Sequence, residues 1–190
     1  MQQEYGEGKT FEKTDFTKKL LAKGEYEECV FTNCNFSNAN LSEIKFIDCT
    51  FESCNLSNVT LNGTTLRDVT FKNCKMLGVR FDQCNQFGLS FGFDNCILNH
   101  SSFYQTKLKK TTFKNTKLHE ADFTECDLSG SHFDGCDLMS ATFDHTVIEK
   151  ADFRTSFNYS INPDINKIKK ARFALSGIAG LLDKYDIEID

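Results

Sequence analysis

The sequence predicts an all-β solenoid in which the chain turns a corner every five residues. Every fifth residue is apolar from Phe11 to Phe81, and after a shift of two residues the pattern resumes at Phe93 and continues to Phe153. A spacing of five fits neither the 3.6-residue period of an α-helix nor the two-residue period of a strand. Four repeats would make one square coil, and coils stacked at about 4.8 Å would bury one another's apolar ladder.

Composition limits the class of protein. The chain has 190 residues, 19 Phe, one Pro and a net charge of −5, so we expect one ordered domain without a general basic face for nucleic acid. The first ten residues contain no apolar signal core, and no segment approaches the roughly 18 apolar residues of a membrane span. Without such a span we expect no contact with a membrane. An odd number of cysteines, nine, without a secretion signal predicts a reducing, cytoplasmic location.

A second inward position lies two residues before each apolar one. All nine cysteines occupy it, for example Cys29, Cys34 and Cys126, and elsewhere it holds mainly Ala, Val, Ser or Thr. Small buried thiols that act as apolar filler explain every one of these positions, whereas a metal site or a redox pair would explain only some. We therefore expect structural cysteines, no metal and no cofactor.

The shift in phase falls between Phe81 and Phe93. If Phe87 fills the intervening corner, one face carries an unbroken ladder of phenylalanines from Phe11 to Phe153. We therefore expect residues 82–92 to form a bulge or small loop that does not end the solenoid. Gly88 and Gly92 suit the unusual backbone angles of a bulge.

The repeats resemble the pentapeptide-repeat family, whose consensus is Ala, Asp or Asn, Leu or Phe, and two variable residues. The consensus is matched by 39–41 (Ala-Asn-Leu), 121–123 (Ala-Asp-Phe) and 151–153 (Ala-Asp-Phe). The resemblance covers residues 11–157 and implies a right-handed quadrilateral β-helix of about seven coils. Residues 1–10 precede the first repeat and are expected to form an N-terminal arm.

After Phe157 the pattern stops and helix signals begin, so residues 158–190 are expected to form a helical module. Asn162 as the cap, Pro163 at the first helical position and Asp164 predict a first helix that closes the open last coil. A second helix is expected from Ser176. Its apolar stripe predicts a homodimer interface at Ile178, Leu181, Leu182 and Tyr185.

Signatures of catalysis are weak. Residues 6–10 (Gly-Glu-Gly-Lys-Thr) resemble the end of a phosphate-binding loop, but Gln3 stands where its first glycine should be. The four histidines lie outside the inward positions and share no ladder, and no nucleophile–base pair can be defended. We expect a protein that is not an enzyme.

Charge is unevenly distributed near the C-terminal end of the repeats. Between His119 and Asp152 a single base, Lys150, accompanies nine outward acids. A basic band precedes them at Lys107, Lys109, Lys110, Lys114 and Lys117. The acids form either a solvated face or an anionic surface that imitates the backbone charge of a DNA duplex. They are Glu120, Asp122, Glu125, Asp127, Asp134, Asp137, Asp144, Glu149 and Asp152.

The C-terminal segments 161–166 (Ile-Asn-Pro-Asp-Ile-Asn) and 180–185 (Gly-Leu-Leu-Asp-Lys-Tyr) resemble the quinolone-resistance and microcin-immunity branch of the family. That resemblance implies that the chain mimics DNA, binds DNA gyrase and topoisomerase IV, and protects these enzymes from quinolones or a peptide toxin. It also implies a dimer formed through the C-terminal segment. The small 82–92 segment departs from the large projecting loops of quinolone-resistance members. Two alternatives remain: a scaffold with an unrelated partner, and a nucleic-acid binder that uses the basic band.

Overall fold

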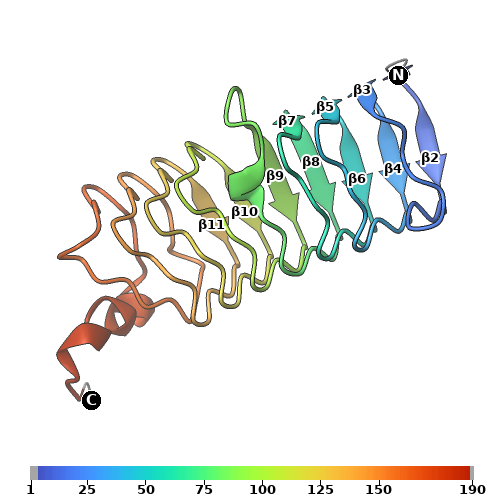
Figure 1. Ribbon diagram of the computed structural model, residues 1–190. Helices are drawn as coiled ribbons and strands as arrows, with labels where there is room; N and C mark the ends of the chain where they lie inside the picture. Colours follow the sequence, from blue (N-terminus) through green and yellow to red (C-terminus); the bar gives the residue numbers. More distant parts are fainter. Residues whose placement is uncertain (1–3, 189–190) are drawn as a thin grey trace.

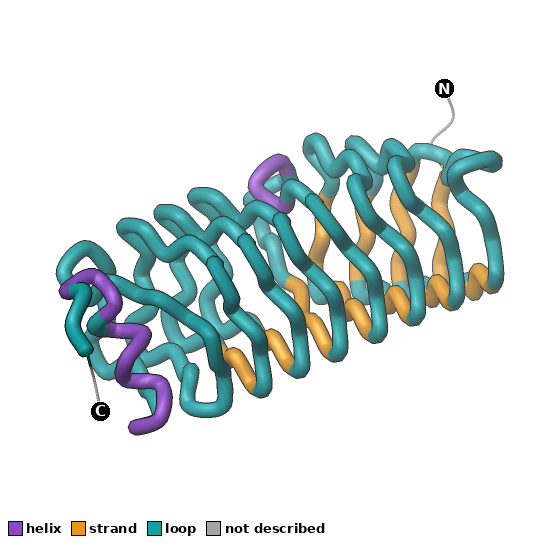
Figure 2. Tube along the Cα trace, turned by 90° about the horizontal axis from the view of Figure 1, so that it is seen from below, coloured by secondary structure: helices purple, strands orange, loops and turns teal. Residues whose placement is uncertain are grey.

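The computed structural model describes residues 4–188 as a straight rod in which the chain winds about the long axis, with the two termini at opposite ends (Figure 1, Figure 2). Parallel pairing joins residues about 20 apart, so each coil lies directly on the next. The rod has two parallel sheets, a short one in the N-terminal coils and a longer one that continues to residue 134. The first has four strands: β1 (Glu4–Glu7), β3 (Gly24–Glu27), β5 (Lys45–Ile47) and β7 (Thr65–Arg67). The second has seven: β2 (Thr10–Glu12), β4 (Val30–Thr32), β6 (Thr50–Glu52), β8 (Val69–Lys72), β9 (Phe91–Asp94), β10 (Thr112–Lys114) and β11 (His132–Asp134).

The rod has four walls, named here by their inward ladders. Wall 1 holds the seven-stranded sheet and the ladder that starts at Phe11, and wall 2 holds the ladder that starts at Phe16. Wall 3 holds the ladder from Leu41 through Phe103, and wall 4 holds the four-stranded sheet and the later ladder from Leu108 to Ile148. The chain visits walls 1 to 4 in this order, so residues five apart in sequence lie on adjacent walls.

Wall 1 carries the predicted ladder of phenylalanines. Eight rings from Phe11 to Phe153 enclose seven turns of the solenoid, which confirms the expected β-helix, and Phe173 adds a ninth ring. Neighbouring rings stack in parallel with centroids 4.6–5.4 Å apart. The rise between coils of a parallel sheet therefore sets the stacking distance, and it falls in the favourable range for aromatic pairs.

The second inward position is as compact as the sequence predicts. All nine cysteines are buried and free. Several thiols donate to a backbone carbonyl of the preceding coil; the Sγ of Cys136, for example, lies 3.3 Å from the carbonyl oxygen of Phe113. Burial raises the pKa of Cys49, Cys126 and Cys136 to about 12. These thiols therefore stay protonated and pack as small apolar groups at neutral pH.

The expected N-terminal arm at residues 1–10 is wrong for the part that the structure describes. Residues 4–7 form β1 and residues 10–12 form β2, both paired with the following coil, and Gly6 lies in register with Tyr26. Sequence reasoning missed this coil because Gly6 supplies no side chain to the apolar ladder. Residues 1–3 lie outside the described part of the chain.

Residues 82–92 form the expected loop, but the prediction that Phe87 fills a corner of the core is wrong. A 3₁₀ turn, η1 (Phe81–Gln83), leads into a loop that projects from the rod, and Phe87 is 79% exposed rather than buried in a corner (Figure 1). Phe91 fills the interior instead. It occupies the small second inward position, is 6% exposed and contacts the rings of Phe81 and Phe93. A large side chain there occupies the space that the departing loop leaves open.

The expected first C-terminal helix is wrong. The coil pattern continues past Phe157, with Lys167 paired to Val147 and Arg172 paired to Asp152. Asn166 explains the outcome: its buried amide accepts from the backbone N–H of Thr146 at 2.7 Å and donates to the carbonyls of Phe143 and Asn162. The bonds to Thr146 and Phe143 join Asn166 to the preceding coil, and a helix in this segment would leave those two backbone groups unpaired. The helix signal of Asn162 and Pro163 produces only a turn.

The predicted second helix is present as two 3₁₀ segments, η2 (Leu175–Leu181) and η3 (Asp183–Tyr185). It closes the last coil, the role expected of the first helix: the N–H of Ile161 donates to the carbonyl of Gly180 at 2.8 Å. A Cβ at Gly177 or Gly180 would overlap Tyr159, so only glycine permits this close approach.

Candidate interaction surfaces

The turns at the corners decide where outward side chains lie. In most repeats the second residue after the inward Phe or Leu adopts a positive φ, a conformation that Asn and Gly tolerate best. The residue before the inward one is often Asp or Asn, and its side chain accepts the N–H of the residue two positions later. Asp122 accepts from Thr124 at 2.9 Å and Asp127 from Ser129 at 3.1 Å. Part of the acid content is therefore structural.

The nine predicted acidic residues encircle the rod and do not share one wall. A chain that changes wall every five residues distributes a run of acids over all sides. Asp134 and Asp152 lie on wall 1, Asp137 on wall 2, Asp122, Glu125 and Asp144 on wall 3, Asp127 and Glu149 on wall 4, and Glu120 at the corner between walls 2 and 3.

Two of these carboxylates pair with lysine or arginine, and a third contacts the partly buried His119. Asp127 pairs with Lys109 at 3.2 Å, and Asp137 lies 2.7 Å from His119. Asp152 pairs with Arg154 at 2.7 Å and with Arg172 at 3.3 Å. The hydrogen bond from Arg154 holds the pKa of Asp152 at about 2. These groups carry less free charge for a partner than their number suggests.

Four of the remaining acids make one contiguous patch, which we name the wall 3 acidic patch: Glu120, Asp122, Glu125 and Asp144. None of these four pairs with lysine or arginine among residues 4–188. Their neighbours are His100, 3.3 Å from Glu120, and His145, 2.6 Å from Asp144, while Gln105 donates to Glu125 at 2.9 Å. The four carboxylates give the patch a formal charge of −4 at neutral pH.

The projecting loop presents an aromatic residue that sequence reasoning placed in the core. The N–H of Phe87 donates to the side chain of Asn85 at 3.0 Å, and Gln86 donates to the carbonyl of Cys84. This turn directs Phe87 away from the rod, and Gly88 follows it with φ +69°. The signal in the sequence was Asn85 two residues before Phe87, the same turn pattern found at the corners.

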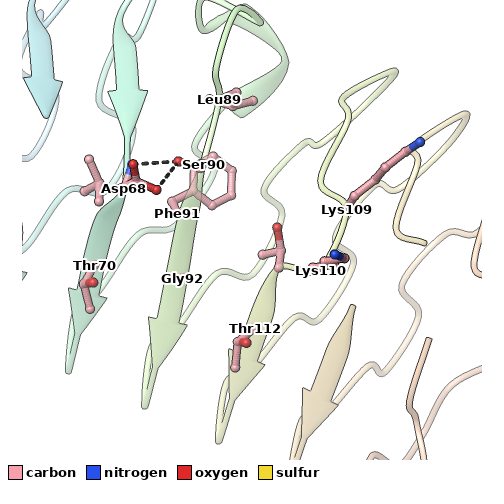
Figure 3. A pocket seen from close by; sticks show the side chains of 11 residues that line it. Asp68, Thr70, Leu89, Ser90, Phe91, Gly92, Lys109, Lys110 and Thr112 are labelled. Atoms are coloured by element: carbon pink, nitrogen blue, oxygen red, sulfur yellow. Dashed lines mark hydrogen bonds between the residues drawn. The ribbon is translucent and has the colours of Figure 1, made fainter. Parts of the chain in front are cut away.

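A shallow hollow of about 360 Å³ lies beside β9 (Figure 3). Gly92 stands between Thr70 and Thr112 in successive coils, and the missing side chain opens the surface there. Asp68 and Ser90 form a 2.8 Å hydrogen bond at one side, and Lys109 and Lys110 lie at the other. The hollow is polar and open.

The predicted dimer residues divide into two groups. Leu181 packs against the core and Leu182 is half-buried, so both serve the cap. Ile178 is 41% exposed and Tyr185 is 55% exposed. Together with exposed Phe157, Leu175 and Ile187 they give this end of the rod an apolar surface. No helix in the described part of the chain has the length and apolar character needed to cross a membrane.

A four-walled parallel solenoid with a five-residue repeat defines the class of protein. The pentapeptide repeat region family matches residues 25–92 and 78–153, more than half of the sequence, and the chain belongs to the pentapeptide-repeat family. No curated protein matches the sequence at a significant level.

Among solved structures, the fold is similar to two trypsin-treated variants of QnrB1, a plasmid-mediated fluoroquinolone resistance protein. One aligns with a TM-score of 0.69 at 18% identity and covers 98% of this chain and 92% of that chain. The other aligns with a TM-score of 0.58 at 17% identity, with 98% and 100% covered. At such identities the likeness concerns the fold.

Proposed function

We propose that this chain is a non-enzymatic, DNA-mimicking protein that binds a type II topoisomerase, DNA gyrase or topoisomerase IV, and protects it from quinolones or a peptide toxin. The observation that carries the proposal is the wall 3 acidic patch on a rigid rod whose fold is similar to that of QnrB1. The nine free, buried thiols support the cytoplasm as the place of action.

The dimensions of the rod support competition with DNA. Seven turns at about 4.8 Å give a length near 34 Å, which corresponds to roughly ten base pairs of duplex. A topoisomerase holds the phosphates of its DNA with basic side chains, so fixed carboxylates at its DNA site would compete electrostatically. The stacked coils hold the acids in place, which reduces the ordering cost of binding.

A dimer would double this length. We propose that two copies join at the C-terminal end through Ile178 and Tyr185, with Leu181 and Leu182 supporting the surface from below. Because Leu181 packs on the core, its replacement would damage the cap as well as an interface. Light scattering on the Ile178→Asp, Tyr185→Ser double variant, which should be a folded monomer, tests the interface. A wild-type chain that is monomeric at micromolar concentration contradicts it.

The acidic patch is tested by removing charge without removing the turn contacts. The triple variant Asp122→Asn, Glu125→Gln, Asp144→Asn keeps the shape of each side chain, and the amide oxygen introduced at position 122 can still accept from Thr124. Surface ion pairs contribute about 0.5 kcal/mol each, so binding to purified gyrase should weaken about tenfold and become less sensitive to salt. Biolayer interferometry measures the affinity, and a supercoiling assay with ciprofloxacin measures protection.

The matched control removes three acids at the N-terminal end of the rod: Glu12→Gln, Glu28→Gln and Asp48→Asn. This variant should bind within about twofold of wild type, because these groups lie several coils from the patch. Equal losses in both triple variants would mean that the acids are only a solvated surface. Absence of gyrase binding by the wild type would refute the proposal itself.

A scaffold that binds an unrelated protein is the second candidate. The exposed Phe87 on the projecting loop favours it, because a large exposed aromatic group can anchor a protein interface regardless of the partner's charge. Replacing Phe87 by Ser separates the two functions: the scaffold function predicts loss of partner binding, while competition with DNA through wall 3 predicts little change in gyrase affinity.

A further inference from the structure

Wall 4 of the C-terminal half carries charge of the opposite sign to the rest of the chain. Seven exposed lysines project from outward and corner positions of three among four successive coils, and the second coil, at 127–130, contributes none. The pairing of 107 with 127, 127 with 147 and 147 with 167 aligns these coils along one side of the rod. We name this surface the lysine wall: Lys107, Lys109, Lys110, Lys150, Lys167, Lys169 and Lys170.

Most of this positive charge is uncompensated. In the part of the chain that the structure describes, the pair of Lys109 with Asp127 is the ion pair that involves a lysine of the wall. Glu149 is the second carboxylate on this wall, so seven lysines face two acids and the local charge is +5, in a chain whose net charge is −5. At about 0.1 M salt the screening length is near 10 Å, so a ligand on this wall would experience mainly the lysines.

The shape of the surface indicates which anion fits it. The wall is one side of a square coil, and exposed Glu125 stands at its corner with wall 3. Wall 1, at the other border, carries charges of both signs: Asp134 and Asp152 lie there with Lys114, Arg154 and Arg172. A nucleic acid that extends onto wall 3 would meet Glu125 and the other carboxylates of the wall 3 acidic patch. An extended peptide is narrow enough to avoid them, and at about 3.3 Å per residue four or five residues span the four coils.

We infer that the lysine wall is a docking surface for an extended acidic segment of a partner protein. The inference does not depend on the proposed function, because it uses a different wall and the opposite charge. Lysines that precede and follow the inward residues would lie on both sides of the bound segment. The buried side chains of Leu108, Leu128 and Ile148 anchor the backbone of this wall to the core. Figure 3 shows Lys109 and Lys110 at the end of this surface, beside the hollow at Gly92.

Fluorescence anisotropy with a labelled peptide of ten glutamates tests the inference, with a ten-nucleotide deoxythymidine strand as the competing class. We expect the peptide to bind the full chain at 50 mM NaCl and the oligonucleotide to bind more weakly. The variant Lys107→Gln, Lys150→Gln, Lys169→Gln should lose about tenfold in affinity for the peptide, as expected for three surface ion pairs. The control Lys19→Gln, Lys72→Gln, Lys75→Gln removes the same charge elsewhere and should change affinity less than twofold.

Three results would overturn the inference. The first is no binding of the glutamate peptide to the wild-type chain. The second is binding of the oligonucleotide as tight as, or tighter than, that of the peptide, which would make the wall a nucleic-acid surface. The third is an equal loss in the two triple variants, which would show that overall charge rather than wall 4 decides binding. Circular dichroism spectra that match wild type confirm that both variants are folded.

Discussion

Replacing Phe133 by alanine should destabilise the solenoid more than the same replacement at its N-terminal end. The ring of Phe133 is fully buried and lies between Phe113 at 4.7 Å and Phe153 at 4.6 Å, with Phe123 packed edge-on at 5.9 Å. Truncating a buried phenylalanine costs about 3–5 kcal/mol, and this site loses two stacked pairs, so we expect a value near 4 kcal/mol.

Phe11 provides the matched control. It stands in the first coil, is partly exposed and has one parallel neighbour, Phe31 at 4.8 Å. The Phe11→Ala variant should lose only about 1–2 kcal/mol, because less surface is buried and the end of the rod can relax into the opening. A Phe133→Leu variant introduces leucine, the residue at many inward positions of walls 2 to 4, and should lower the free energy of unfolding by about 1 kcal/mol.

Urea unfolding followed by circular dichroism at 25 °C measures all three variants, with the midpoint and the slope fitted separately. The expected order of stability is wild type, Phe133→Leu, Phe11→Ala and then Phe133→Ala. Equal losses for the two alanine variants would refute the reasoning, since they would show that ring stacking between coils does not govern stability.

Further outcomes are expected for the thiols, for Asp152 and for the C-terminal cap. Cys126→Ala should cost about 1 kcal/mol or less, and the nine native thiols should resist alkylation at pH 8 until the chain is unfolded, as mass spectrometry can show. Asp152 has a folded pKa of about 2, below its ordinary value near 3.9. Its pair with Arg154 therefore stabilises the fold above about pH 4, and this stabilisation is lost as pH falls toward 2. The Asp152→Asn variant lacks this titration, so its stability should change less with pH in this range of an acid unfolding experiment. Tyr159→Phe should raise stability by about 1 kcal/mol in thermal unfolding, because it removes a buried hydroxyl without a hydrogen-bond partner in the described part of the chain. Gly180→Ala should release the cap, because the new Cβ would overlap Tyr159, and hydrogen exchange in the cap should become faster.

The sequence by itself determined the repeat, and with it the solenoid. An inward residue every five positions allows one regular packing, in which stacked coils bury every ladder. The sequence alone therefore assigns Phe31, Phe113 and Phe153 to one wall. The same logic placed Cys126 and the other thiols inside. These assignments hold because each depends on contacts with the next coil at a fixed spacing.

Only the tertiary structure decided the features that depend on where the chain lies on the rod. Phe87 and Phe91 are equally apolar, and the space left by the loop selects Phe91 for the core. Asn166 overrides the helix signal of Asn162 and Pro163 through bonds to the preceding coil. The acids that are adjacent in sequence are separated onto four walls, while lysines about 60 residues apart come together on one, because position around the coil is set by register and not by order along the chain.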